Sequence, residues 1–131
     1  MPVSYFIDHE KKRLYTKATG SVTFIDLREH MRSEFGRTTA AYSELFDCTG
    51  ATAELDADDM RSLVKERSQI AQVQDAAPVA IVAPAEKFYD LFKIFNSLTS
   101  SIRPIAVFRE TSEAEQWLDR VSNTISNEPL K

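Results

Sequence analysis

The chain has 131 residues and a net charge of −4, from 16 Lys and Arg against 20 Asp and Glu; 43% of its residues are hydrophobic and one is Cys. This size and composition fit one compact domain that needs no disulfide or structural metal to fold. No apolar run approaches the roughly 20 residues that cross a membrane, and no signal-like segment opens the chain, so we expect a cytoplasmic protein. The mildly acidic balance argues against a nucleic-acid partner, which usually needs a basic face.

The first part of the chain predicts a β-hairpin. Residues 3–8 and 13–19 are rich in β-branched and aromatic side chains, and the charged residues between them are typical of a turn. We assign the basic triplet Lys11-Lys12-Arg13 to this turn. Gly20 is expected to end the second strand.

A helix and a short buried strand are predicted next. Thr23 and Asp26 form a variant capping box, in which two side chains satisfy N–H groups at the start of a helix. The apolar residues of this helix recur at spacings of three and four and form one stripe: Phe24, Leu27, Met31 and Phe35. Residues 36–41 predict a loop, and the apolar segment 44–48, bounded by Gly50, predicts a buried strand.

A second helix is predicted from Asp56, because acidic residues crowd into its first turn, where the helix dipole favours them. Its apolar residues share one face: Met60, Leu63, Val64, Ile70 and Ala71. Arg67 lies in the middle of that face, where we expect its stem to be buried and its charge to reach solvent; the alternative is a carboxylate partner. The apolar run over residues 78–83 predicts a central strand.

Two further helices flank a last strand. Pro84 suits the first turn of a third helix that runs to about Leu98, and residues 104–108 predict the strand that follows. Ser112 and Glu115 form a capping box for a fourth helix. The apolar residues of that helix lie on one stripe: Ala114, Trp117, Leu118, Val121 and Ile125.

The predicted order of elements is therefore β-β-α-β-α-β-α-β-α, in one domain over residues 1–131 with a frayed tail at 127–131. Strands that alternate with helices imply right-handed parallel crossovers for the last four strands, with the first strand antiparallel to the second at one edge. The predicted fold class is α/β, a mixed five-stranded sheet under four helices.

The third helix is more apolar than a helix that only covers a sheet. Its apolar residues span an arc of about 160°, against the roughly 100° that such a helix needs; they are Phe88, Leu91, Phe92, Ile94, Phe95 and Leu98. The excess has three interpretations: deeper burial, an interface with a partner or second copy, or the wall of a pocket for an apolar ligand. Tyr89 is expected at the rim of such an interface.

No cluster of residues demands catalysis or a metal. The acidic residues around the second helix start match no calcium-loop spacing, and acids in a first turn already stabilise a helix; they are Glu54, Asp56, Asp58 and Asp59. Cys48 has no His near it in sequence, which favours a buried structural thiol over a nucleophile. His9 and His30 show no ligand spacing and are expected to be solvated. We therefore predict no metal, no cofactor and no catalytic residue.

The strand and loop around Cys48 resemble a known family. The segment Leu45-Phe46-Asp47-Cys48-Thr49-Gly50-Ala51-Thr52, followed by Asp56-Ala57-Asp58, is similar to the STAS superfamily of sulphate-transporter and anti-sigma-factor-antagonist domains. In that family a Ser after the loop Asp is phosphorylated, and its charge at a helix N-terminus alters partner binding. If Asp56 takes the place of that Asp, Ala57 takes the place of the Ser. The resemblance then implies the fold without the phosphorylation switch, and Asp58 or Asp59 is a hypothetical source of a permanent charge.

The rest of the chain is similar to the bacterial SpoIIAA-like proteins, a STAS-related group of single-domain cytosolic proteins. The segments that carry this resemblance are Val79-Ala80-Ile81-Val82-Ala83-Pro84, Val107-Phe108-Arg109 and Ala114-Glu115-Gln116-Trp117-Leu118. The resemblance implies the fold and a habit of binding proteins or small ligands.

Our leading hypothesis is a non-enzymatic STAS-like regulatory domain that binds a protein partner or a second copy of itself. Its candidate partner-binding loop is Thr49, Gly50, Asp56, Ala57, Asp58 and Asp59, and its candidate interface or pocket is Phe88, Tyr89, Leu91, Phe92, Phe95 and Arg67. The alternative is a carrier or sensor of an apolar small molecule, lipid-like or nucleotide, between the third helix and the sheet. A hydrolase built around Asp47, Cys48 or Arg67 is a third hypothesis, but the sequence shows no nucleophile and base pair.

Overall fold

The computed structural model describes residues 2–35, 42–70, 77–99 and 104–126, and its elements follow the predicted order. They are β1 (Val3–Asp8), β2 (Arg13–Thr23), α1 (Phe24–Phe35), β3 (Ser43–Glu54), α2 (Ala57–Ile70), β4 (Val79–Val82), α3 (Glu86–Thr99), β5 (Ile105–Phe108) and α4 (Thr111–Ser126). The predicted loop 36–41 and the predicted tail 127–131 lie outside the described residues.

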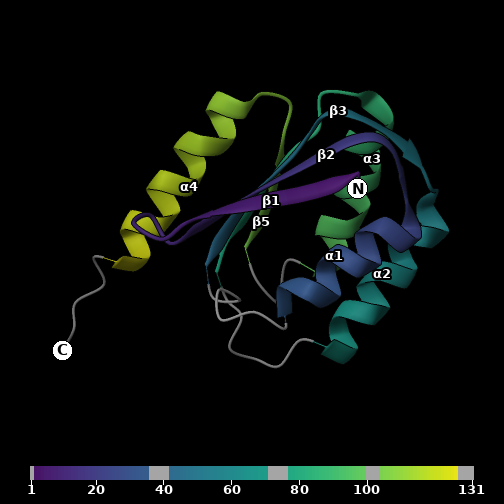
Figure 1. Ribbon diagram of the computed structural model, residues 1–131, viewed down its shortest axis with the longest axis horizontal. Coiled ribbons are helices and arrows are strands. Elements are labelled where there is room, and N and C mark those ends of the chain that lie inside the picture. Colours follow the sequence, from purple (N-terminus) through teal and green to yellow (C-terminus); the bar gives the residue numbers. More distant parts are fainter. Residues whose placement is uncertain (1, 36–41, 71–76, 100–103, 127–131) are drawn as a thin grey trace.

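The five strands form one mixed sheet in the order β1-β2-β3-β4-β5 (Figure 1). β1 is antiparallel to β2, and every other pair of neighbours is parallel. The predicted fold class is confirmed, and because β2 pairs with β3, the hairpin places β1 at an edge of the sheet.

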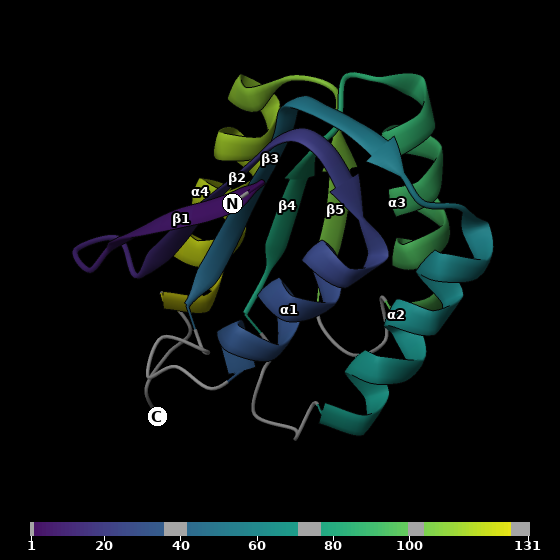
Figure 2. The same cartoon turned by 45° about the vertical axis from the view of Figure 1, so that its right-hand side comes forward.

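The helices lie on both faces of the sheet, whereas the sequence analysis placed the sheet under all four. α1, α2 and α3 cover one face and α4 covers the other (Figure 2). Helices α1, α2 and α3 each connect two neighbouring parallel strands, and the connections step along the sheet in one direction. Connections of the same handedness then place their helices on the same face. α4 follows the last strand and connects no two strands, so this rule does not apply to it. It buries Ala114 and Leu118 against Leu45, Ala80 and Val82.

The strands β2 and β3 are longer than predicted. Gly20 does not end β2 but lies within it at a positive φ of 69°, a conformation that glycine adopts without strain. Gly50 likewise lies inside β3. Within the described chain, β3 beyond Asp47 pairs with β2 alone, and the two strands continue as a curved ribbon toward α1 and α2 (Figure 2). Ala51 and Ala53 of this ribbon alternate inward, which buries them in the core.

Two helix starts are fixed by reciprocal side-chain caps. The carboxylate of Asp26 accepts a hydrogen bond from the N–H of Thr23 at 2.9 Å, and Thr23 Oγ1 accepts one from the N–H of Asp26 at 3.2 Å. The carboxylates of Asp56 and Asp59 each accept a bond from the other residue's N–H, at 2.9 and 3.0 Å. The capping box predicted for α1 is confirmed, and the acids at the start of α2 have the same role.

Two other helix starts differ from the prediction. α3 begins at Glu86, so Pro84 precedes the helix rather than lying in its first turn. α4 begins at Thr111, and the N–H of Ala114 bonds to the carbonyl of Glu110, so Ser112 is inside the helix and does not cap it. In the described ranges, no helix has both the length and the apolar character needed to span a membrane.

Candidate functional site

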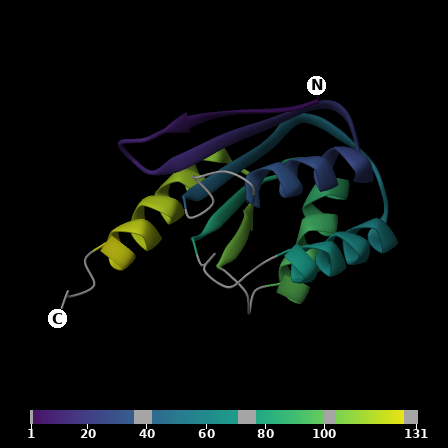
Figure 3. The same ribbon diagram turned by 60° about the horizontal axis from the view of Figure 1, so that its bottom comes forward.

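An open groove of about 320 Å³ lies on the α4 face, between the β1–β2 hairpin and the first turns of α4. Figure 3 shows the hairpin running above α4 in the same general direction. α4 packs mainly on β3, β4 and β5 and meets β2 through Arg13 and Tyr15, so the described helices leave part of the β1–β2 face exposed, including Phe6. The residues that line the groove are Ser4, Tyr5, Phe6, Tyr15, Thr16, Lys17, Leu45, Asp47, Thr111 and Glu115.

A stacked aromatic pair forms the hairpin side of the groove. Phe6 and Tyr15 are directly opposite each other in the β1–β2 register, and their rings stack with centroids 5.0 Å apart. Phe6 is 64% exposed, which is unusual for a large apolar side chain. Lys17 and Asp47 are register partners on β2 and β3 and add one charge of each sign.

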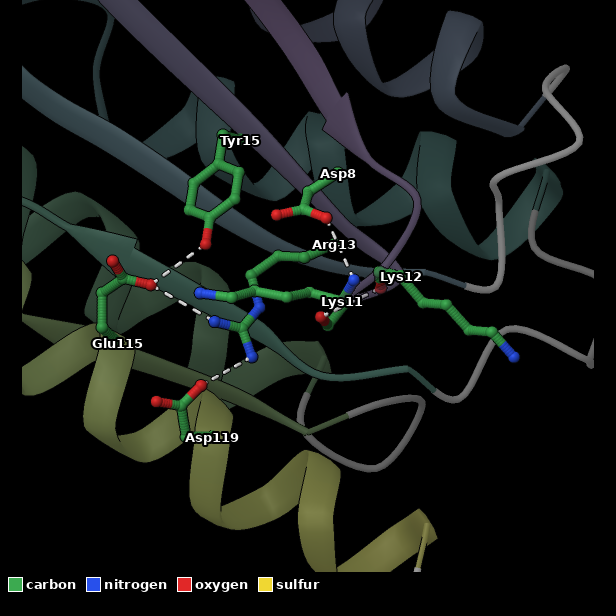
Figure 4. Close-up of polar contacts among 8 residues, drawn as sticks. Asp8, Lys11, Lys12, Arg13, Tyr15, Glu115 and Asp119 are labelled. Carbon is green, nitrogen blue, oxygen red and sulfur yellow. Dashed lines mark hydrogen bonds and ion pairs between the residues drawn. The ribbon is translucent and has the colours of Figure 1, made fainter.

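Arg13 connects the hairpin to α4 across the end of this groove (Figure 4). Its guanidinium is buried, with Nη1 3.2 Å from Glu115 Oε1 and Nη2 3.0 Å from Asp119 Oδ1. The hydroxyl of Tyr15 donates to the same Glu115 oxygen at 3.2 Å. Burial lowers the pKa of Arg13, but hydrogen bonds with Tyr15 and Asp119 outweigh it, so the pKa is raised from its ordinary value. The hairpin is therefore held against α4 by ionic contacts.

These contacts correct two predictions. Arg13 begins β2, as the predicted strand 13–19 has it, so the assignment of this residue to the turn with Lys11 and Lys12 is wrong; its side chain points onto the α4 face. The carboxylate of Glu115 binds Arg13 and Tyr15, so it is committed to the hairpin rather than to a cap of its own helix.

A smaller cavity of about 80 Å³ lies on the other face, between the sheet and the three helices that cover it. Its helix side is formed by Leu27, Met31, Leu63, Phe92 and Phe95, and its sheet side by Phe46, Val79, Ile81 and Ile105. Two further lining residues, His30 and Glu44, are polar. The cavity is thus an apolar space with one polar corner.

The polar corner is a buried hydrogen-bond network. His30 Nε2 and Glu44 Oε2 are 2.7 Å apart, and their side chains are only 8% and 5% exposed. The hydroxyl of Thr16 donates to the same Glu44 oxygen at 2.7 Å. The His30 ring packs edge-on against Phe46. The prediction that His30 is solvated is therefore wrong, because α1 turns this residue toward the sheet; His9, in contrast, is exposed in the hairpin turn and contacts Tyr42 Oη at 3.0 Å.

Cys48 is buried in the core on the α1 side of β3, as the sequence analysis expected. Burial, and then the negative charges of Asp47 and Glu44, raise the pKa of its thiol far above the ordinary value. A neutral, buried thiol is a poor nucleophile, because the thiolate is the reactive form.

Most of the apolar residues of α3 face inward. Phe88, Leu91 and Phe92 are buried, and the rings of Phe88 and Phe92 stack 5.6 Å apart. A partner cannot reach these three side chains, so deeper burial rather than an interface accounts for them. Phe95 is half-buried against the core, and Tyr89, also half-buried, packs its ring 4.0 Å from the Arg109 guanidinium.

The residues predicted to form a partner-binding loop are divided between a strand and a helix start. Thr49 and Gly50 are exposed positions inside β3, so they are not in a loop. Asp56 and Asp59 cap α2. The first two residues of this helix are Ala57 and Asp58, and the carboxylate of Asp58 forms an ion pair with Arg61 at 2.7 Å.

In the part of the chain that the structure describes, no group of three or more His, Cys, Asp or Glu side chains is arranged to bind a metal ion. The side chain of Arg67 lies outside the described residues.

No protein-family model matches the chain, and no curated protein matches it significantly. Among solved structures, it is similar to a crystal structure from Shewanella loihica PV-4, an uncharacterised protein of the DUF3478 family with a SpoIIAA-like fold. The two chains are 21% identical with a TM-score of 0.59, and the match covers 88% of this chain and 93% of the other. This likeness shows a SpoIIAA-like fold, as the sequence resemblance implied.

Proposed function

We propose that this chain is a non-enzymatic binding domain that holds an extended segment of a protein partner in the groove between the β1–β2 hairpin and α4. The observation that supports this most is the exposed Phe6–Tyr15 stack, which offers a ready apolar contact beside the groove. The surface differs from the one expected from sequence, because Phe88, Leu91 and Phe92 of α3 are buried.

The position of β1 favours a peptide over a compact ligand. β1 is an edge strand with β2 as its one neighbour in the described chain. The N–H of Thr19 bonds to the carbonyl of Pro2, and bonded pairs alternate along an antiparallel ladder, so the backbone groups of Val3 and Ile7 point away from β2. An extended peptide can add to such an edge while one of its side chains enters the groove.

A binding function also agrees with the state of the reactive side chains. The Cys48 thiol is buried and its pKa is raised, and the His30 imidazole bonds to Glu44 rather than to a nucleophile. Neither arrangement gives the nucleophile and base pair that covalent catalysis needs.

The experiment is a selection of peptides from a displayed random library, followed by affinity measurements with two matched variants. Phe6→Ser removes the exposed ring of the groove, and Leu98→Ser removes a side chain of α3 that is 49% exposed and does not line the groove. We expect peptides that bind the wild type and the Leu98→Ser variant equally but bind Phe6→Ser at least about tenfold more weakly. Equal weakening by both variants, or no enriched peptide, would overturn the proposal.

A second candidate function, binding of a small apolar molecule, is favoured by the cavity on the other face. Phe92 and Phe95, two of the six residues predicted to form an interface or a pocket, both line it. The two sites lie on opposite faces of the sheet, so each can be tested without the other.

A further inference from the structure

We propose that β1 pairs with itself, so that the extended segment bound beside the groove is the β1 strand of a second copy of this chain. The two strands run antiparallel around a two-fold axis at Tyr5 and join the two sheets into one. This inference rests on the proposed function and names its partner.

β1 lacks the features that usually keep an edge strand from pairing. Natural edge strands are protected by charged side chains, by proline or by a bulge. Residues 3–7 contain no charge and no proline, and their register with β2 is regular. Tyr5 and Phe6 are 46% and 64% exposed, and they point to opposite faces because side chains alternate along a strand. The strand thus presents apolar surface on both faces at the outer edge of the molecule (Figure 3).

The backbone of β1 fits an antiparallel copy of itself. The N–H and C=O groups of Val3 and Ile7 point away from β2. With the axis at Tyr5, Val3 of one copy lies opposite Ile7 of the other, so these residues form bonded pairs on both sides of the axis. An axis at Phe6 is less favourable, because it places Val3 opposite His9, which lies in the turn rather than in the strand.

The side chains that meet in this register are complementary. Tyr5 lies opposite Tyr5 of the second copy, and aromatic cross-strand pairs stabilise a sheet. On the α4 face, Phe6 of the second copy lies opposite Ser4, which lines the groove. Asp8 is the one charged residue of β1 and lies beyond the paired range 3–7. No like charges therefore face each other, and the ring from the second copy reaches the groove.

The short length of the paired range sets the expected affinity. Stable interfaces bury about 1,200–2,000 Å² in total, and a single pair of strands about 17 Å long falls below that range. We therefore expect a reversible dimer with a Kd between about 10 and about 100 μM.

The test is sedimentation of the full chain from about 1 μM to about 1 mM, with a charge swap at the axis. Tyr5→Lys places two positive charges opposite each other, and Tyr5→Glu places two negative charges there. We expect each variant to dimerise at least about tenfold more weakly than the wild type, and an equal mixture of the two to recover the wild-type affinity.

Two further measurements support the charge swap. Leu98→Lys is the matched control, because Leu98 is 49% exposed and lies on α3, which packs on β3 and β5; it should dimerise like the wild type. A synthetic peptide of residues 2–8 in excess should dissociate the wild-type dimer, and this result does not depend on how the variants fold.

The outcomes separate self-pairing from the function on which it rests. A wild type that stays monomeric while library peptides still bind the groove would overturn self-pairing but leave the peptide-binding function. A monomer that binds no peptide would overturn both. A dimer that the Tyr5 variants or the peptide of residues 2–8 leave intact, or that the mixture does not restore, would place the contact elsewhere and also overturn the inference.

Discussion

Buried ionisable residues are stabilised in different ways at three places in this molecule. Arg13 keeps its charge because two carboxylates of α4 face its guanidinium. One carboxylate oxygen of Glu44 accepts a hydrogen bond from the Thr16 hydroxyl and contacts His30 Nε2. Cys48 is buried beside the negative charges of Asp47 and Glu44, so its neutral form is favoured. In each case, burial of an unpaired charge is avoided.

The thiol of Cys48 should make the stability of the protein depend on alkaline pH. Its folded pKa is raised by burial, while an unfolded thiol loses its proton near about pH 8.5. Above that pH the unfolded chain ionises and the folded chain does not, so the free energy of unfolding falls by about 1.4 kcal/mol per pH unit. This stability is fully present below the unfolded pKa and is lost as the pH rises.

Urea unfolding of the wild type and Cys48→Ala at about pH 7.5 and about pH 9.5 measures the effect. We expect the wild type to lose about 1.4 kcal/mol more than the variant over this interval, because only the wild type carries the thiol. Parallel losses in the two proteins would contradict a raised pKa.

At the scale of single elements, helix starts depend on local side-chain bonds. Asp56 and Asp59 bond to each other's N–H groups at the start of α2, whereas Asp58 pairs with Arg61 at the surface, and its side chain is 90% exposed. These neighbouring carboxylates look alike in sequence, but a cap satisfies a backbone donor and an exposed ion pair contributes little.

Alanine substitutions should distinguish these roles. We expect Asp56→Ala to lower the free energy of unfolding by about 1 kcal/mol, and Asp58→Ala to lower it by less than about half of that. Chemical denaturation at neutral pH measures both values. Equal losses would mean that the reciprocal cap adds nothing to the general effect of acids at a helix N-terminus.

The whole molecule has two cores that share the same strands. β3 and β4 send alternate side chains to opposite faces, so Phe46 and Ile81 join the larger core while Leu45 and Ala80 join the smaller core under α4. Neither face can lose its packing without disturbing strands that the other face needs. Arg13 further ties α4 to the hairpin.

The two cores should therefore unfold together. Trp117 is the one tryptophan of the sequence and packs against the smaller core, so its fluorescence reports on α4, while far-ultraviolet circular dichroism reports on all elements. We expect coincident transitions, and a loss of about 2–5 kcal/mol in both for Leu118→Ala, because Leu118 is fully buried. A separate early transition of Trp117 would show that α4 unfolds independently.

Features that depend on residues close together in the chain were predictable from the amino-acid sequence. The hairpin, the order of the strands and helices and the Thr23–Asp26 cap follow from periodicity and from spacings of a few residues, which local physics dictates. The wide apolar arc of the third helix likewise indicated that this helix has a neighbour besides the sheet, and Phe92 and Phe95 of this arc line the cavity between the sheet and the helices.

Contacts between side chains that are distant in the sequence became visible only in the folded chain. Arg13 and Glu115 are separated by 102 positions, and His30 and Glu44 by 14 positions across a crossover, so no local pattern could indicate either pair. The groove lies where α4, on the face opposite to the other helices, leaves part of β1 and β2 exposed. This follows from chain connectivity and packing rather than from any segment's own preference. Both candidate sites therefore depend on the assembled fold, since their polar residues come from different elements.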